Sequence, residues 1–177
     1  VDSMGRVTST TFSQITITTL ANTNTGSPTP TTSVTNPQEL NFYDAFGNLV
    51  ESVDRNGRHS FAYYDVLGRQ IALVDAAGYL TQTDYDDIGH VVQQRKYSVK
   101  LGSVAANVLP TAPNNTPAVI DRIYDSAGHL IDEISPKVHV AGGNDLRVVT
   151  HYTYDLAGNV LSTTLGYSSV PNCGQSH

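Results

Sequence analysis

The sequence is poor in several features that identify common classes of protein. Its 177 residues contain a single Cys, which excludes a framework of internal disulfide bonds. Only ten residues are Lys or Arg, and the formal net charge of −6 argues against a nucleic-acid partner, because such a partner requires a basic face. No run of 18 apolar residues occurs, so no membrane-spanning segment is expected. With 39% hydrophobic residues, the composition is nevertheless that of a folded chain.

Motifs that identify enzymes and cofactor sites are also missing. The sequence has no P-loop, no Gly-x-Ser-x-Gly and no His-Glu-x-x-His. The three Glu residues, Glu39, Glu51 and Glu133, are too widely spaced to suggest a catalytic carboxylate pair. We therefore predict no enzymatic activity, no catalytic residue and no cofactor.

Metal ligands do not stand at the spacings that metal sites require. Among the six His, only His177 has a partner at zinc-ligand spacing, Cys173, and both lie in an expected loose tail. The densest acidic cluster, residues 84–87, does not fit an EF-hand loop, because Arg95 occupies the twelfth position where a Glu is needed. A hydrated turn is the interpretation that we favour for this cluster, and no metal site is predicted.

What the sequence does contain is a repeated turn signal, an Asp followed three residues later by a Gly. It occurs eight times, whereas random placement of the Asp and Gly residues would give about one occurrence. Asp at the first position and Gly at the fourth are typical of a type I turn whose last residue is left-handed, followed by a β-bulge. The eight pairs are Asp2/Gly5, Asp44/Gly47, Asp54/Gly57, Asp65/Gly68, Asp75/Gly78, Asp86/Gly89, Asp125/Gly128 and Asp155/Gly158.

The segments between these turns are typical of β-strands. They are about seven residues long and rich in β-branched and aromatic residues. In most of them polar residues recur at every second position over part of the segment. No segment has a sustained apolar period of 3.6 residues, so little helix is expected. We predict an all-β fold, a repetitive antiparallel strip of β-hairpins. Examples of the expected strands are 49–53, 61–64, 70–74 and 79–85.

Five of the turn aspartates directly follow a Tyr at the end of an expected strand. Tyr43, Tyr64 and Tyr85 are spaced by 21 residues each time. A ring at this position is expected to stack on the ring of the next repeat, which would form an aromatic ladder along the strip. Packing is thus the favoured role of these rings, and stacking against a sugar stays open for exposed ones.

Two stretches interrupt the period and are expected to be surface excursions, one rich in Thr and Pro and one containing few apolar residues. A smaller excursion is expected at 140–145. The predicted organisation is a partial repeat at 1–20, an excursion at 21–39, repeats at 40–101, an excursion at 102–118, repeats at 119–166 and a tail at 167–177.

The repeated unit, Tyr-Asp-x-x-Gly followed two residues later by two mostly apolar residues, stands at 43–50, 64–71 and 154–161. It resembles the YD repeat of the Rhs family, which occurs in bacterial Rhs effectors, the B and C components of insecticidal Tc toxins, and animal teneurins. The resemblance covers about residues 1–20 and 40–165. The residues that would carry this structural motif are Tyr43, Asp44, Gly47, Asp54, Gly57, Tyr64, Asp65, Gly68, Asp75, Gly78, Tyr85, Asp86, Gly89, Tyr124, Asp125, Gly128, Tyr154, Asp155 and Gly158.

The resemblance implies a hairpin strip that coils into a hollow shell, which in bacterial members encloses a C-terminal toxin domain. A strip of this length would be a piece of the wall, and the start at Val1 favours a piece of a longer chain. Many bacterial members release their cargo by self-cleavage at an Asp-Pro motif. This sequence has no Asp-Pro dipeptide, so no catalytic residue is carried over.

The function predicted from the sequence is therefore structural. The chain is expected to be a segment of a shell that encapsulates or scaffolds a toxin or effector domain, as part of a larger bacterial protein that is secreted or lies at the cell surface. Its expected partners are the remainder of the shell and the enclosed domain. The alternative is a carbohydrate-binding or adhesion module on a cell surface, since the ten Tyr offer platforms for glycans.

Overall fold

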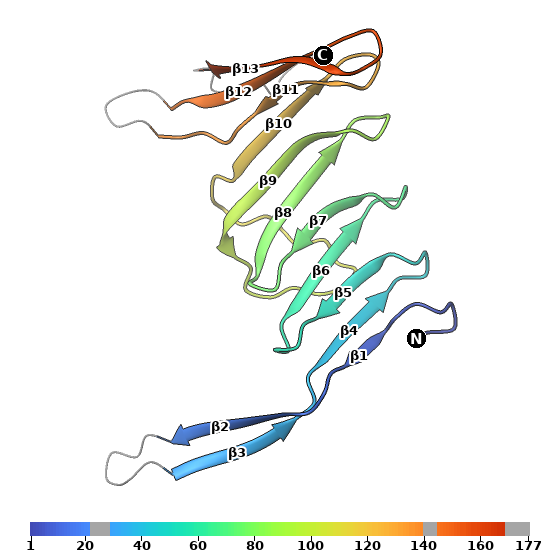
Figure 1. Cartoon of the computed structure of the whole chain (residues 1–177), viewed down its shortest axis with the longest axis vertical. Helices are drawn as coiled ribbons and strands as arrows, with labels where there is room; N and C mark the ends of the chain where they lie inside the picture. Colours follow the sequence, from blue (N-terminus) through green and yellow to red (C-terminus); the bar gives the residue numbers. More distant parts are fainter. Residues whose placement is uncertain (22–28, 140–144, 169–177) are drawn as a thin grey trace.

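The computed structural model describes residues 1–21, 29–139 and 145–168, and in these ranges every regular element is a β-strand and none is a helix (Figure 1). The prediction of an all-β fold is confirmed. The strands are β1 (Ser9–Thr11), β2 (Ile15–Ala21), β3 (Thr29–Thr35), β4 (Gln38–Tyr43), β5 (Leu49–Val53), β6 (His59–Tyr64), β7 (Gln70–Val74), β8 (Tyr79–Tyr85), β9 (Val91–Lys100), β10 (Ala118–Tyr124), β11 (Leu130–Ile134), β12 (Arg147–Tyr154) and β13 (Val160–Ser168).

Eleven of the strands form one antiparallel sheet, in which spatial order follows chain order from β4 to β13. β1 lies beside β4 and completes the N-terminal end of the sheet. The sheet is a long, twisted strip in which every strand between β1 and β13 pairs with a neighbour on each side (Figure 1). Such a strip depends on contacts between neighbours, as repeat proteins do.

The strip has two rows of turns, one along each edge. Five hairpins turn at the same edge, on the right in Figure 1, and each of them contains a Tyr-Asp unit. They are β4–β5, β6–β7, β8–β9, β10–β11 and β12–β13. We call this the Tyr-Asp edge. The turn of Asp2, before β1, lies at this edge too, because the carbonyl of Val7 accepts a hydrogen bond from the Tyr43 hydroxyl. The turns of Asp54 and Asp75 lie at the other edge, which we call the opposite edge.

The first excursion differs from the sequence prediction. Residues 29–35 form β3, which pairs with β2 over seven positions in a separate two-stranded ribbon. The ribbon leaves the strip between β1 and β4 (Figure 1). Alternating Thr residues favour strand formation through their β-branched side chains, a preference that the Thr- and Pro-rich composition concealed.

The second excursion also differs, because it packs against the sheet. Residues 101–117, which we call the strap, run behind β7 and β8 in Figure 1. Strap residues Leu101, Val104 and Ala112 pack against a buried cluster of five sheet residues. These five are Tyr63, Ala72, Val74, Leu80 and Tyr97. The strap therefore gives one face of the sheet its hydrophobic core.

The remaining excursion and the tail lie largely outside the described residues. The expected excursion at 140–145 contributes only Asp145 to the described ranges, and the tail contributes only Tyr167 and Ser168. Cys173 and His177 lie outside the described residues.

Candidate functional site: the Tyr-Asp edge

The eight turns share one hydrogen-bond pattern, which the turn of Asp65 illustrates. The Asp65 Oδ1 accepts from the backbone N–H groups of Leu67 and Arg69, each at 2.9 Å. The Gly68 N–H donates to the Asp65 carbonyl at 3.0 Å. Oδ1 of each of the other seven aspartates likewise accepts from the second and fourth residues after it. The carboxylates are thus acceptors for the backbone that they bend.

Each turn Gly has a positive φ, from +73° at Gly57 to +101° at Gly89. A residue with a Cβ rarely adopts this conformation, which accounts for Gly at the fourth position. The ladder shifts register immediately before the Tyr of each Tyr-Asp hairpin, for example between Tyr63 and Tyr64. This irregularity is the bulge that accompanies a turn of this type.

The second carboxylate oxygen reaches the side chain of the residue four positions after the Asp, which we call the coupler. Oδ2 of Asp65 accepts from the Arg69 Nε at 2.7 Å. The couplers that contact their own Asp in this way are Arg6, Asn48, Arg58, Arg69, His90, His129 and Asn159. The coupler is therefore fixed in direction by the turn from which it comes.

These contacts hold seven of the turn carboxylates in the ionised form. Hydrogen bonds from the backbone and side chain of Arg69 lower the pKa of Asp65 below its ordinary value, and those from His129 do the same for Asp125. Burial raises the pKa of Asp86, but the hydrogen bonds from His90 and Gly89 outweigh it. The remaining aspartates with a lowered pKa are Asp2, Asp44, Asp54 and Asp155.

The Tyr of each Tyr-Asp unit connects its hairpin to the preceding one. Its hydroxyl donates to the backbone carbonyl of the fifth residue after the preceding turn Asp at this edge, at distances of 2.7 to 3.1 Å. Burial raises the pKa of Tyr64 and Tyr124, so these phenols remain protonated donors at neutral pH. The five bonds are Tyr43 to Val7, Tyr64 to Leu49, Tyr85 to Gln70, Tyr124 to Val91 and Tyr154 to Leu130.

These hydroxyl bonds stand where the backbone ladder between hairpins has already stopped. The last registered pair of β7 and β8 toward this edge is Ala72 with Gln82, two residues short of the Gln70 carbonyl. The Tyr85 hydroxyl satisfies that carbonyl. A side chain thereby replaces a backbone donor, which lets successive hairpins separate at this edge without an unpaired polar group.

The ring of the same Tyr receives the coupler of the preceding turn on its face. The Arg6 and Arg69 guanidinium groups lie 4.5 Å and 4.8 Å from the ring centroids of Tyr43 and Tyr85. The His90 ring stacks on Tyr124 at 4.4 Å, and the His129 ring stacks on Tyr154 at 4.7 Å. These four couplers thus contact both their own Asp and the Tyr of the next hairpin.

The predicted ladder of Tyr on Tyr is wrong. Among the described residues no two of these Tyr rings stack on each other, since the coupler occupies the place that a neighbouring ring would take. Successive hairpins are about 10 Å apart, two strand spacings, which is too far for direct ring contact. His90 and His129, which directly follow the turn Gly in the sequence, are links between hairpins. Arg, Asn or His stands four residues after seven of the eight turn aspartates, and this recurrence was the signal that could have identified them.

The opposite edge lacks this arrangement. Asp54 and Asp75 follow Val53 and Val74 instead of Tyr, and the apolar core supplies the contacts there. Leu80 is fully buried, and the Gly78 carbonyl accepts from the Leu101 N–H of the strap at 3.0 Å. The opposite edge is therefore held by apolar packing beneath the strap.

Polar residues that sequence reasoning missed form a chain on one face of β8 to β12. Arg95 pairs with Asp84 at 2.5 and 2.8 Å, which corrects the interpretation of that carboxylate as part of a hydrated turn. Gln93 and Arg147 both donate to Asp121. The Arg147 side chain is buried and its charge is compensated by Asp121, together with three backbone carbonyls. No local pattern marked these residues, because their partners come from different strands.

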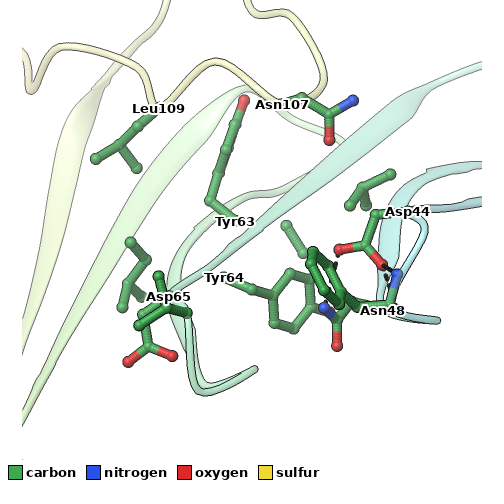
Figure 2. Close-up of a pocket in the computed structure, with 12 residues that line it drawn as sticks. Asp44, Asn48, Tyr63, Tyr64, Asp65, Asn107 and Leu109 are labelled. Carbon is green, nitrogen blue, oxygen red and sulfur yellow. Dashed lines mark hydrogen bonds between the residues drawn. The ribbon is translucent and has the colours of Figure 1, made fainter.

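Several of the concave surfaces lie beside the strap. One pocket of about 300 Å³ is bounded by Asp44 and Asn48 of one turn, by Tyr63 and by strap residues Asn107 and Leu109 (Figure 2). In Figure 2 Tyr63 points toward the strap, where its hydroxyl donates to the Ala105 carbonyl at 2.9 Å. Within the described ranges no three His, Cys, Asp or Glu residues gather as a metal site would require. In those ranges, too, no helix has the length and apolarity to cross a membrane.

One comparison with known proteins matches the repeat directly. The family model described as RHS Repeat matches residues 43–80. A comparison with curated proteins found no match. Similar solved structures include the TcdB2-TccC3-Cdc42 crystal structure, at 16% identity and a TM-score of 0.33, with 97% of this chain and 11% of that chain covered. They also include the TcdB2-TccC3-TEV crystal structure and a Tc holotoxin pore of Photorhabdus luminescens, both at 16% identity, with TM-scores of 0.26 and 0.25 and coverage of 94% of this chain and 11% of each.

The chain thus spans about a tenth of the length of these toxin chains. The match at 43–80 contains four of the eight turns, those of Asp44, Asp54, Asp65 and Asp75. The resemblance recognised from the Tyr-Asp units is confirmed, since residues 43–80 match the model of the RHS repeat.

Proposed function

We propose that this chain is a segment of the wall of an RHS repeat shell, and that the shell encapsulates or scaffolds a toxin or effector domain. The parent would be a larger bacterial protein that is secreted or lies at the cell surface. The role of the segment is structural and not enzymatic. Its partners are the neighbouring hairpins of the same wall and the enclosed domain.

The observation that carries this proposal is the open end of the strip at β13. Among the described residues, β13 pairs only with β12, along the whole of its length. Its side chains Leu161, Leu165 and Tyr167 are 68%, 73% and 76% exposed. An outermost strand that is exposed and carries apolar side chains favours pairing with a further strand. The next hairpin of a wall would cover this strand.

The repeated link at the Tyr-Asp edge supports the same role. Five successive hairpins use the same hydroxyl bond, so a further hairpin with a Tyr-Asp unit would add to the strip in the same way. The bond replaces the ladder at one edge only, which separates the hairpins there and lets the strip curve. A strip that curves at every step is suited to a closed wall.

Protease protection in the parent protein tests the proposal. We expect that a domain enclosed by the intact wall resists trypsin, and that Leu165→Lys, which places a charge on the face of β13, opens the wall and exposes the domain. Val66→Lys is the matched control, because Val66 lies fully exposed at a turn tip away from β13. Equal cleavage of the domain in the unmodified parent and in Leu165→Lys would overturn the encapsulating role.

A glycan-binding module is the alternative, favoured by the exposure of aromatic side chains such as Tyr167 and Phe46. The couplers already cover one face of the rings of Tyr43, Tyr85 and Tyr124, which leaves fewer platforms for a sugar. A glycan array separates the two roles. A selective hit that is lost on Tyr167→Ala would support the module, whereas a wall segment should bind no glycan.

A further inference from the structure

The coupler position differs in chemistry along the Tyr-Asp edge. Two couplers are Arg, at Arg6 and Arg69, and carry a permanent charge. A third coupler, Asn48, lies beside Gly68 of the following turn and carries no charge. Two successive couplers toward the C-terminal end are His90 and His129, and a His is the side chain whose charge changes near neutral pH.

Both His couplers have the same surroundings. The Nδ1 atom of His90 lies 3.0 Å from Asp86 Oδ2, and that of His129 lies 2.9 Å from Asp125 Oδ2. Their rings stack on the following Tyr at interplanar angles of 17° and 23°. Each ring therefore bridges the carboxylate of its own turn and the aromatic ring of the next hairpin.

The outer edge of each imidazole reaches the next turn. A Cβ added at Gly128 would stand 3.1 Å from the His90 Nε2, and one added at Gly158 would stand 3.1 Å from the His129 Nε2. The two His thus touch three successive hairpins in series, β8–β9, β10–β11 and β12–β13. A change in the charge of these rings acts at the two junctions between those hairpins.

The charged and titratable groups near these rings are few. Within its own turn His90 faces Asp86, and the preceding Arg69 guanidinium donates to the Asp86 backbone carbonyl at 3.1 Å. From β10 it faces Tyr124, on which Arg122, Asp86 and Glu133 act electrostatically. His129 faces Asp125 within its own turn and Tyr154 from β12. The nearest ionised partner of each ring is therefore a carboxylate.

We propose that the His90 and His129 couplers make the two C-terminal hairpin junctions acid-responsive. One proton taken up from solvent turns each imidazole into a cation, and this cation stands where Arg69 places its guanidinium between Asp65 and Tyr85. The hydrogen bond from a neutral ring to the ionised carboxylate then becomes an ion pair, and the stacking on the Tyr becomes a cation–π contact. The junctions tighten in mild acid and loosen as the pH rises.

The direction follows from linkage between protonation and folding. Contacts that only the protonated ring makes stabilise the folded chain in acid, and this stabilisation is lost as the pH rises. The partner carboxylates remain ionised in mild acid, because hydrogen bonds lower the pKa of Asp86 and Asp125. The carboxylate partner of each ring therefore keeps its charge in mild acid.

The molecule supplies its own control for the measurement. Amide hydrogen exchange of the wild-type chain, corrected for the intrinsic effect of pH, is compared at about pH 8 and about pH 5.5. We expect protection near Tyr124 and Tyr154 to rise several-fold in acid, and protection near Tyr64 and Tyr85 to stay constant, because Asn48 and Arg69 do not titrate there. Equal pH dependence at all four positions would overturn the proposal.

A pair of double variants provides the second measurement. In His90→Asn/His129→Asn the couplers are neutral, and in His90→Arg/His129→Arg they are charged at every pH. We expect the melting temperature of the wild type to rise by about 2–4 °C relative to the Asn variant between about pH 8 and about pH 5.5, and the Arg variant to show no such relative rise. A wild type that changes in parallel with the Asn variant would contradict the proposal.

The acid response would regulate the wall, and in that respect it rests on the proposed function. The two ideas fail separately, because exchange and melting are measured on this chain alone and the protease test on the parent. An acid response without protection of an enclosed domain would contradict the proposed wall function, and the acid response of the junctions would still stand. Protection without an acid response removes only the present inference.

Discussion

The two edges of the strip use the same turn but hold neighbouring hairpins together in different ways. At the Tyr-Asp edge, a Tyr hydroxyl and a coupler side chain join each hairpin to the one before it, as Tyr85 and Arg69 do. At the opposite edge no Tyr precedes the turn, and the contacts come from buried apolar side chains such as Val74 and Leu80. One edge thus depends on polar and aromatic links of fixed geometry, and the other on apolar burial.

This difference accounts for where the chain departs from its repeat. The ribbon of β2 and β3, the strap, and the connection between β11 and β12 all leave the sheet at the opposite edge. The Tyr-Asp edge keeps the same turn length in all five hairpins, because the Tyr must meet a carbonyl five residues after the preceding turn Asp. Insertions are tolerated where no such link would be broken.

The largest effect is expected at the opposite edge, from Leu80→Ala. Leu80 is fully buried beneath the strap, so the substitution leaves a cavity and costs about 2–5 kcal/mol of unfolding free energy. Denaturant unfolding measures the loss. The matched control is Leu156→Ala at a turn tip of the Tyr-Asp edge, where the side chain is fully exposed. A similar loss for both variants would show that apolar burial does not distinguish the two edges.

The next effect separates two turn glycines that both have a positive φ. Gly128→Ala at the Tyr-Asp edge brings a Cβ to 3.1 Å from the His90 ring, whereas Gly57→Ala at the opposite edge meets nothing within 4 Å. Both pay the cost of a left-handed residue, about 1–2 kcal/mol, and Gly128→Ala also displaces the His90 ring. We expect Gly128→Ala to be the more destabilising by about 1 kcal/mol, as measured by thermal melting. The reverse order would contradict the coupler contact.

A smaller effect is expected from the hydroxyl that joins two hairpins. Tyr85→Phe removes the donor to the Gln70 carbonyl and costs about 1 kcal/mol. Tyr79→Phe is the control at the opposite edge, because the Tyr79 ring contacts Lys100 through its face, which Phe retains. Amide exchange near Gln70 should increase in the first variant and not in the second. Equal behaviour of the two variants would show that the hydroxyl bond adds nothing to the junction.

The turns and strands could be predicted from the sequence because their determinants are local. Asp65 and Gly68 shape the same four residues that they occupy, and the strands follow from what lies between such turns. The partner of Tyr85 could not be predicted by the same reasoning. Arg69 precedes β7 whereas Tyr85 ends β8, so the two residues meet only once these strands have paired. The strap was misread because its few apolar residues, such as Val104, gain their significance only against a sheet face that is formed by distant strands.

The smallest effect concerns the turn carboxylates, which the two edges share. Hydrogen bonds from Arg58 lower the pKa of Asp54, and hydrogen bonds from Arg69 lower that of Asp65. A lowered pKa in the folded chain means that the stabilisation is present above the unfolded value near 3.8 and is lost as the pH falls through the folded value. Each of the variants Asp54→Asn and Asp65→Asn should therefore lose part of the fall in melting temperature that the wild type shows as the pH decreases.

Salt should then distinguish the two edges where acid alone does not. The Arg58 side chain is 58% exposed, whereas Arg69 is 29% exposed because it lies over Tyr85. Screening acts more strongly on the exposed pair, so about 0.5 M NaCl should remove most of the effect of Asp54→Asn and less of the effect of Asp65→Asn. Melting curves at low and high salt measure both. If salt removed the two effects equally, the Tyr ring would not shield the coupler, and the difference between the edges would reside in the hydroxyl bond alone.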